Sequence, residues 1–223
     1  MITFNPAPDR ACVDRHSPLI RAACALLAPA NDDRNLALTR TGRLSRAEIA
    51  RVAPDLLPAA RPGARAASER DVPPLRALRE LILALDLART HRRRLCPTRA
   101  GADLADSPDR AFALIVPPFL FGVRHMWEPA SPPPGDWRLF LAVLDGQGAA
   151  GITAHDFSKA LYGITDCDLA APLHANVLCP LGWVGMLTPH ARDPWHVFER
   201  TPLWHEALCR DPAHAKDNVV PLR

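Results

Sequence analysis

The chain has 223 residues, of which 48% are hydrophobic and 23% are charged, and this composition excludes an intrinsically disordered protein. The formal net charge is +3. Residues 1–110 hold 19 arginines against 13 acidic residues, giving +6, whereas residues 111–223 hold 8 basic and 11 acidic residues, giving −3. A basic first half indicates an anionic partner for that half. Arginines greatly outnumber lysines throughout, as is typical of a GC-rich genome, so an arginine by itself does not identify a site.

The sequence predicts a reducing, cytoplasmic setting. The six cysteines form no Cys-x-x-Cys pair, and the first residues contain no apolar stretch typical of a signal peptide. The longest apolar run, residues 111–123, is too short to span a bilayer and contains two prolines. We expect the thiols to serve mainly as small core side chains.

The first half of the chain opens with a helix, an extended segment and a second helix. Ser17 and Pro18 provide an N-cap and a proline at the first helical position. Residues 36–38 are expected to be extended, and a turn follows at residues 39–42. The Ser-x-x-Glu pattern of residues 45–48 is a capping box that starts the next helix.

A longer helix and a hairpin complete this half. Residues 59–70 are rich in proline, glycine and arginine and predict a flexible loop, after which Asp71 is expected to cap a helix with a leucine-rich face. Residues 87–90 and 95–97 predict two short strands, joined by a turn at residues 91–94. The order of helix, strand, two helices and hairpin is that of a winged-helix domain, in which the hairpin is the wing.

The second half repeats this order with different residues. Asp136 is expected to cap its first helix, and Thr153 its second, which Gly163 ends. A third helix over residues 165–180 contains Pro172, which is expected to kink it. Two strands from residue 181 onward, a short closing helix and a frayed tail follow.

We therefore predict a mainly α protein with small β wings, built as tandem winged-helix-like modules. The first module spans residues 1–105 and carries the basic wing, and the second spans residues 136–223. Residues 106–135 are expected to form a helical connector and a proline-rich linker.

One short motif occurs twice in the first half of the chain. Residues 36–42 and 95–101 share the pattern Leu-x-x-Thr-Arg-x-Gly, in which threonine can hydrogen-bond the turn and glycine can supply a positive φ. A recurrent strand-to-helix turn is sufficient to explain this pattern.

The combination of motifs resembles an uncharacterised bacterial family with tandem winged-helix-like modules. The resemblance covers roughly residues 30–210 and implies a fold, with no established chemistry. It rests on two threonine-glycine turns, an acid-capped leucine-rich helix and two late motifs, found here at residues 38–44, 95–101, 71–87, 182–183 and 201–203.

Basic residues of the first module form the candidate nucleic-acid-binding site. The densest cluster lies at the predicted wing tip, and arginines of neighbouring elements extend it. Such residues suit the phosphates of DNA or another polyanion, whose neutralisation releases counterions. A solvated loop on an arginine-rich protein is the alternative. The candidate residues are Arg40, Arg43, Arg46, Arg76, Arg79, His91, Arg92, Arg93, Arg94 and Arg99.

The second module is less suited to DNA, because Asp166 and Asp168 at the start of its third helix would repel phosphate. Its aromatic residues are expected either to pack in the core or to form an interface with a protein partner or a second copy. The candidate interface residues are Trp183, Trp195, Phe198 and Trp204.

We expect no enzyme activity, no cofactor and no metal. The spacing of His190, His196 and His205 does not match zinc sites, and no phosphate-binding glycine loop or hydrolase motif is present. A pocket that brought Cys167 and His174 together would indicate an enzyme instead.

The sequence thus favours a DNA-binding protein of regulatory or accessory type, whose second module mediates association. The alternative is a protein–protein adaptor in which neither module binds nucleic acid.

Overall fold

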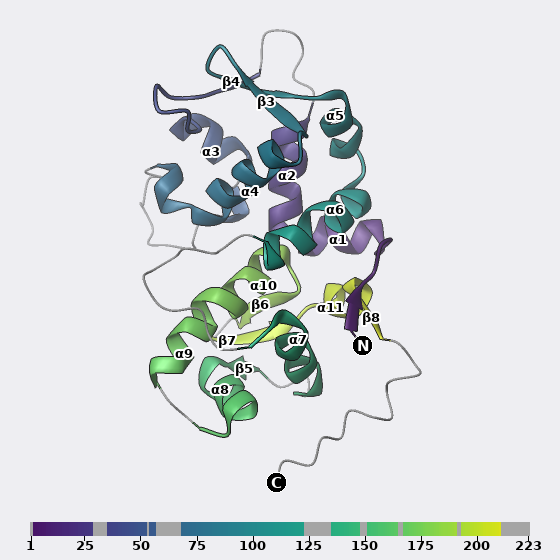
Figure 1. Ribbon diagram of the computed structural model, residues 1–223, viewed down its shortest axis with the longest axis vertical. Helices are drawn as coiled ribbons and strands as arrows, with labels where there is room; N and C mark the ends of the chain where they lie inside the picture. Colours follow the sequence, from purple (N-terminus) through teal and green to yellow (C-terminus); the bar gives the residue numbers. More distant parts are fainter. Residues whose placement is uncertain are drawn as a thin grey trace.

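In a computed structural model the chain is mainly helical, with three small antiparallel sheets in its described part (Figure 1). This confirms the predicted fold class of mainly α with small β wings. None of the helices in that part is long and apolar enough to cross a bilayer. The structure describes residues 2–28, 35–52, 54–56, 68–122, 135–147, 151–164, 167–190 and 193–210.

Residues 18–97 of the first module combine three helices with a three-stranded sheet of order β2-β4-β3. Leu36 of β2 pairs with Leu95 of β4, and Ala88 of β3 pairs with Pro97 at the other edge of β4. Two 3-10 turns, Pro54–Leu56 and Glu69–Asp71, lie between its second and third helices. In chain order the elements are α2 (Pro18–Leu27), β2 (Leu36–Ala37), α3 (Arg46–Val52), α4 (Pro73–Ala84), β3 (Ala88–His91) and β4 (Arg94–Pro97).

The second module has the same order of elements, and its sheet has the equivalent strand order β5-β7-β6. Ile152 of β5 pairs with Phe198 of β7. In chain order the elements are α7 (Trp137–Gly146), β5 (Ile152–Thr153), α8 (Ala154–Tyr162), α9 (Cys167–Leu173), a π-helical segment (His174–Leu178), α10 (Cys179–Val184), β6 (Leu187–His190) and β7 (Asp193–Arg200).

Side-chain caps start most of the helices where the sequence predicts. The Ser17 hydroxyl accepts a hydrogen bond from the backbone N–H of Ile20, and the Thr153 hydroxyl accepts one from Asp156. The prediction for Asp71 is wrong: α4 begins after Val72 without a side-chain cap. The Asp71 carboxylate accepts instead from the Ser68 hydroxyl at 2.9 Å.

The third helix of the second module is longer than expected. The π-helical segment follows Pro172, whose carbonyl oxygen accepts a hydrogen bond from the Asn176 side chain at 3.0 Å. The chain then continues as α10 to Val184, and Gly185 ends the helix with a φ of 85°. The prediction of a strand from residue 181 is therefore wrong, and β6 starts at Leu187.

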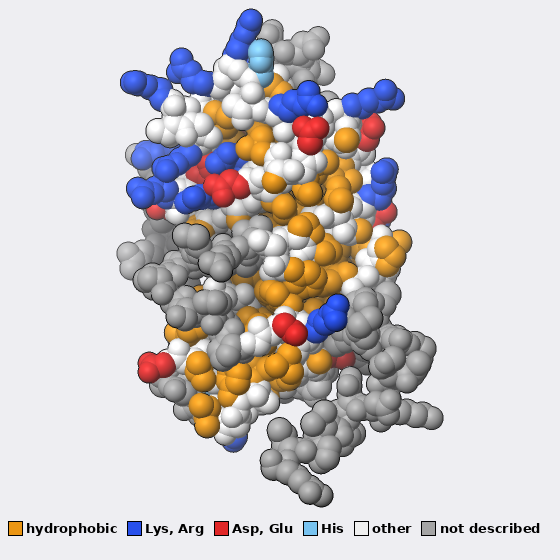
Figure 2. All heavy atoms as spheres, in the orientation of Figure 1, with side chains coloured by type: hydrophobic (Ala, Val, Ile, Leu, Met, Phe, Trp, Pro, Cys, Tyr) orange, Lys and Arg blue, Asp and Glu red, His pale blue; other side chains and the backbone are white. Residues whose placement is uncertain are grey.

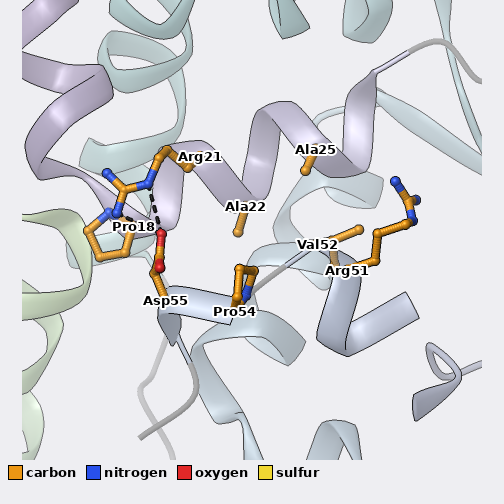
Figure 3. Close-up of a pocket in the computed structure, with 8 residues that line it drawn as sticks. All are labelled: Pro18, Arg21, Ala22, Ala25, Arg51, Val52, Pro54 and Asp55. Atoms are coloured by element: carbon orange, nitrogen blue, oxygen red, sulfur yellow. Dashed lines mark hydrogen bonds and ion pairs between the residues drawn. The ribbon is translucent and has the colours of Figure 1, made fainter. Parts of the chain in front are cut away.

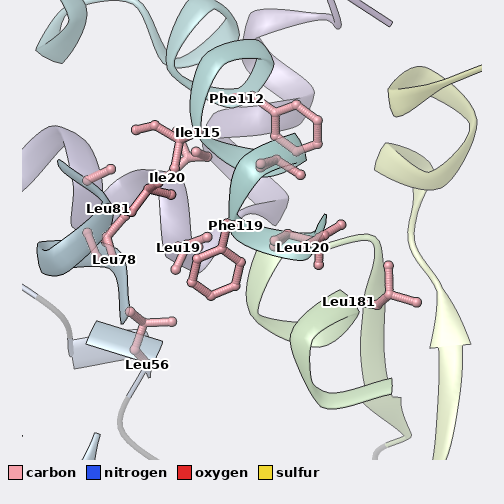
Figure 4. Close-up of a cluster of buried hydrophobic side chains, with 14 of the residues drawn as sticks. Leu19, Ile20, Leu56, Leu78, Leu81, Phe112, Ile115, Phe119, Leu120 and Leu181 are labelled. Atoms are coloured by element: carbon pink, nitrogen blue, oxygen red, sulfur yellow. The ribbon is translucent and has the colours of Figure 1, made fainter. Parts of the chain in front are cut away.

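The two modules share one hydrophobic core. Within the predicted connector, the central helix α6 (Pro108–Phe121) packs against α1, α2, α4, α5 and α10. Figure 4 shows Phe119 of α6 beside Leu19 of α2, while Leu120 extends toward the side where Leu181 of α10 lies. The predicted loop at residues 59–70 lies mostly outside the described residues, and so do residues 123–134 of the predicted connector and linker.

The ends of the described chain close around this core. Strands β1 and β8 pair antiparallel, so that Phe4 lies opposite Leu208. Helix α1 packs against α6 and α11, which ties the start of the chain to the end of the second module. The remaining elements are β1 (Ile2–Phe4), α1 (Arg10–His16), α5 (Arg99–Ala105), α11 (Pro202–Ala207) and β8 (Leu208–Arg210).

Candidate nucleic-acid interface

The tip of the β3–β4 hairpin is a two-residue turn made of consecutive arginines. His91 pairs with Arg94, so only Arg92 and Arg93 connect the strands. Both arginines have positive φ, 46° and 58°. A two-residue turn of this kind favours Asn-Gly, and a left-handed conformation costs other residues about 1–2 kcal/mol each. All four side chains from His91 to Arg94 are exposed.

A second basic turn, residues 39–43, lies beside this tip. The backbone N–H of Leu38 donates to the carbonyl oxygen of Arg93 at 2.9 Å, which joins the two turns directly. Within the second turn, the N–H of Thr39 donates to the carbonyl of Arg43 at 2.7 Å, and Gly42 supplies a positive φ. The Arg40 side chain is exposed and that of Arg43 is half-buried. The structure therefore brings these four arginines of the prediction, Arg40, Arg43, Arg92 and Arg93, to one edge.

Glu69 fixes the base of the second turn from inside the protein. Its side chain is 1% exposed and accepts a hydrogen bond from the backbone N–H of Leu44 at 2.9 Å. Its other oxygen lies 2.6 Å from Nε of Arg79. Arg79 is 11% exposed and thus belongs to the interior, which corrects its assignment to the nucleic-acid contact. The sequence gives no signal for Glu69, because it lies at the end of a segment that reads as a flexible loop.

The third helix, α4, offers few groups for reading bases. Arg76 and Glu80 are exposed, and they form an ion pair with each other at 2.9 Å. The hydrogen bond to the Glu80 carboxylate raises the pKa of the Arg76 side chain. Pro73 and Pro74 occupy the start of the helix, where neither can donate an N–H to a phosphate.

Figure 2 shows lysine and arginine side chains gathered over the end of the molecule that carries β3 and β4, with fewer on the rest of that face. Two further candidates, Arg46 on α3 and Arg99 at the start of α5, are exposed. The basic end thus extends from the hairpin tip over neighbouring helices, and the Leu38–Arg93 hydrogen bond joins its two turns.

Two of the four aromatic residues predicted to form a protein interface lie in the core. Trp204 is fully buried, and its indole N–H donates to the Asp145 carboxylate at 3.0 Å. Phe198 is 4% exposed. This burial corrects the interface prediction for both residues, because neither can reach a partner. Trp183 is half-buried, and the side chain of Trp195 lies outside the described residues.

His174, which would indicate an enzyme if a pocket joined it to Cys167, instead contacts another thiol, that of Cys179. Sγ of Cys179 lies 3.6 Å from Nδ1 of His174, because the π-helical turn stacks residues five apart. Burial raises the pKa of the Cys179 thiol to about 11, so the group is protonated near neutral pH and is a poor nucleophile. The side chain of Cys167 lies outside the described residues.

A pocket of about 220 Å³ lies between α2, α3 and the 3-10 turn that follows α3 (Figure 3). Arg21 crosses one end of it and pairs with Asp55 at 2.8 Å. The same guanidinium donates a hydrogen bond to the carbonyl oxygen of Asp14 at 2.7 Å and so stabilises the C-terminal end of α1. Alanine, proline and valine make up most of the remaining lining. Among the described residues no group of three or more histidine, cysteine or acidic side chains could hold a metal ion.

Comparisons with known proteins identify the two halves separately. The family model of the Y4jL N-terminal domain matches residues 15–110, and that of the y4jL C-terminal domain matches residues 128–202. The matches place the chain in an uncharacterised bacterial family of two domains. The Y4jL N-terminal domain includes both basic turns, and the y4jL C-terminal domain includes the whole second sheet.

One relative matches part of the chain. The uncharacterized protein y4jL of Sinorhizobium fredii (strain NBRC 101917 / NGR234) is 28% identical over 98 residues, which are 43% of this chain and 44% of the relative. The matched segment therefore spans less than half of the relative's length. No solved structure matches the chain.

Proposed function

We propose that the protein binds duplex DNA through the basic end of its first module and that both modules are winged-helix domains. The observation that carries the proposal is the pair of joined basic turns, residues 39–43 and 91–94. In a winged-helix domain the hairpin tip is the part that meets the phosphate backbone, and here it consists of basic residues only. The equivalent strand order of the two three-stranded sheets supports the fold assignment.

The proposed role is regulatory or accessory, with the second module mediating association. The second candidate function is an adaptor that binds only proteins. Four large apolar side chains are between 44% and 51% exposed, and such side chains favour a protein partner. They are Leu114, Phe121, Leu139 and Ile164.

Salt dependence separates the two candidates. Each neutralised phosphate contributes about 0.9 to the slope of log affinity against log salt, so four contacts predict a loss of roughly 100-fold between about 50 and about 200 mM salt. The Arg92→Ala/Arg93→Ala/Arg94→Ala variant should lose at least half of this slope, because it removes two of the four arginines that the joined turns bring to one edge. Fluorescence anisotropy with a short labelled duplex, repeated at several salt concentrations, measures the slope of the wild type and that of the variant.

A matched control removes three exposed arginines away from the basic end, as Arg10→Ala/Arg15→Ala/Arg138→Ala. It changes the net charge equally and should keep the wild-type slope. Equal losses in the two triple variants would show that net charge alone drives binding, and absence of binding by the wild type at low salt would favour the adaptor.

A further inference from the structure

We propose that the contact with duplex DNA is independent of base sequence, because the two joined turns hold the phosphate backbone while α4 reads no bases. This inference rests on the proposed function and names its mode of recognition. The Leu38–Arg93 hydrogen bond and the Glu69–Leu44 hydrogen bond fix the second turn at both of its ends. The backbone that carries the arginines of the two turns is therefore held in place before binding, and only the arginine side chains have to be ordered on the phosphates.

The surface of α4 argues against base reading. Base edges in the major groove are read by bidentate hydrogen bonds from arginine, asparagine, glutamine and similar side chains. The exposed polar residues of this helix are Arg76 and Glu80, which already bond to each other, and Ala84 is exposed next to them. Breaking that ion pair to free Arg76 would leave a carboxylate facing the DNA.

The backbone of the hairpin tip supports the same assignment. Asn-Gly would adopt the positive φ angles of residues 92 and 93 with less strain than two arginines. The fold thus gains nothing from arginine at these two positions, while phosphate binding gains two outward charges. Stability and binding should respond in opposite directions to the same substitution.

The variant Arg92→Asn/Arg93→Gly tests this directly. We expect a higher midpoint of thermal unfolding together with a salt slope lower by about 1.8, which corresponds to two lost phosphate contacts. Arg92→Lys/Arg93→Lys is the matched control and should keep the slope. A variant that unfolds at a lower temperature, or that binds as the wild type does, would overturn the proposal.

Base independence is tested with a pool of random duplexes. The bound fraction is sequenced after several rounds of selection at low salt, and no base should be enriched at any position. The Arg76→Ala/Glu80→Ala variant should bind the pool as well as the wild type does. An enriched motif, or loss of binding in this variant, would overturn base independence while DNA binding stands. Absence of binding by the wild type to any duplex would overturn the proposed function as well.

Discussion

At Gly185 an added methyl group would be disfavoured both by the backbone conformation and by neighbouring backbone atoms. Its φ is 85°, and a Cβ built there would lie 1.9 Å from the carbonyl oxygen of His16 and 2.7 Å from Cα of Ser17. These contacts are backbone atoms at the junction of α1 and α2, so they cannot move as a side chain would. Gly185→Ala is therefore expected to lower the free energy of unfolding by about 3 kcal/mol or more, measured by urea denaturation.

Gly163 is the matched control for this substitution. It also ends a helix with a positive φ, 74°, but nothing lies within 4 Å of a Cβ built there. Gly163→Ala should therefore cost only the backbone strain, about 1 kcal/mol. Equal losses in the two variants would mean that the close approach of the α1–α2 junction to Gly185 contributes nothing.

At the scale of elements, each module has a threonine that caps the helix after its hairpin. The shared Leu-x-x-Thr-Arg-x-Gly pattern includes only the first of these two threonines. Thr98 caps α5 after the last strand of the first sheet, and its hydroxyl donates to the carbonyl of Leu87 at 3.1 Å. Thr201 caps α11 after β7, and its hydroxyl donates to the carbonyl of Gly185 at 2.6 Å. Each threonine thus ties the end of the hairpin to the end of the third helix.

Replacing these threonines by valine keeps the shape and removes the hydroxyl. Thr98→Val is expected to cost about 1 kcal/mol, the usual value of an N-cap. Thr201 is buried, at 7% exposure, and Thr201→Val should cost about 1–3 kcal/mol because the carbonyl of Gly185 loses a buried donor. Urea denaturation of both variants measures the difference, and a smaller loss at Thr201 would contradict the role given to burial.

The sequence predicts elements whose signals are local and misses contacts between distant segments. Serine and threonine caps, leucine spacing and the arginine turn locate α2, α8 and the β3–β4 hairpin correctly. The pairing of β1 with β8 joins residues about 200 positions apart and leaves no local pattern. The burial of Glu69 and Trp204 likewise depends on partners elsewhere in the chain.

The glycine at residue 101 shows a second limit of pattern reading. In the shared pattern it corresponds to Gly42, which does have a positive φ of 72°. Gly101 instead lies inside α5, where a Cβ would lie 1.9 Å from the carbonyl oxygen of Leu87. The same residue type is thus required for a turn in one place and for close packing in the other, and only tertiary structure separates the two reasons.

At the scale of the whole molecule, the shared core predicts that the two modules unfold together. Helix α6 packs against α2 and α4 of the first module and against α10 of the second, with Phe119 and Leu120 at most 1% exposed, and a lone module would expose part of this surface. Four of the five tryptophans lie in the second module and none lies in the first, so tryptophan fluorescence follows mainly the second module, whereas far-ultraviolet circular dichroism follows the helices of both. The two signals should give one midpoint in urea.

Leu120→Ala extends this test to the contact between the modules. The leucine is buried and extends toward the side where Leu181 of α10 lies (Figure 4), and its loss should lower the free energy of unfolding by about 2–5 kcal/mol. Because the core is continuous, both spectroscopic midpoints should fall by the same amount. A variant in which the fluorescence midpoint falls while the circular dichroism trace splits into two steps would show that the modules are separate folding units joined by α6.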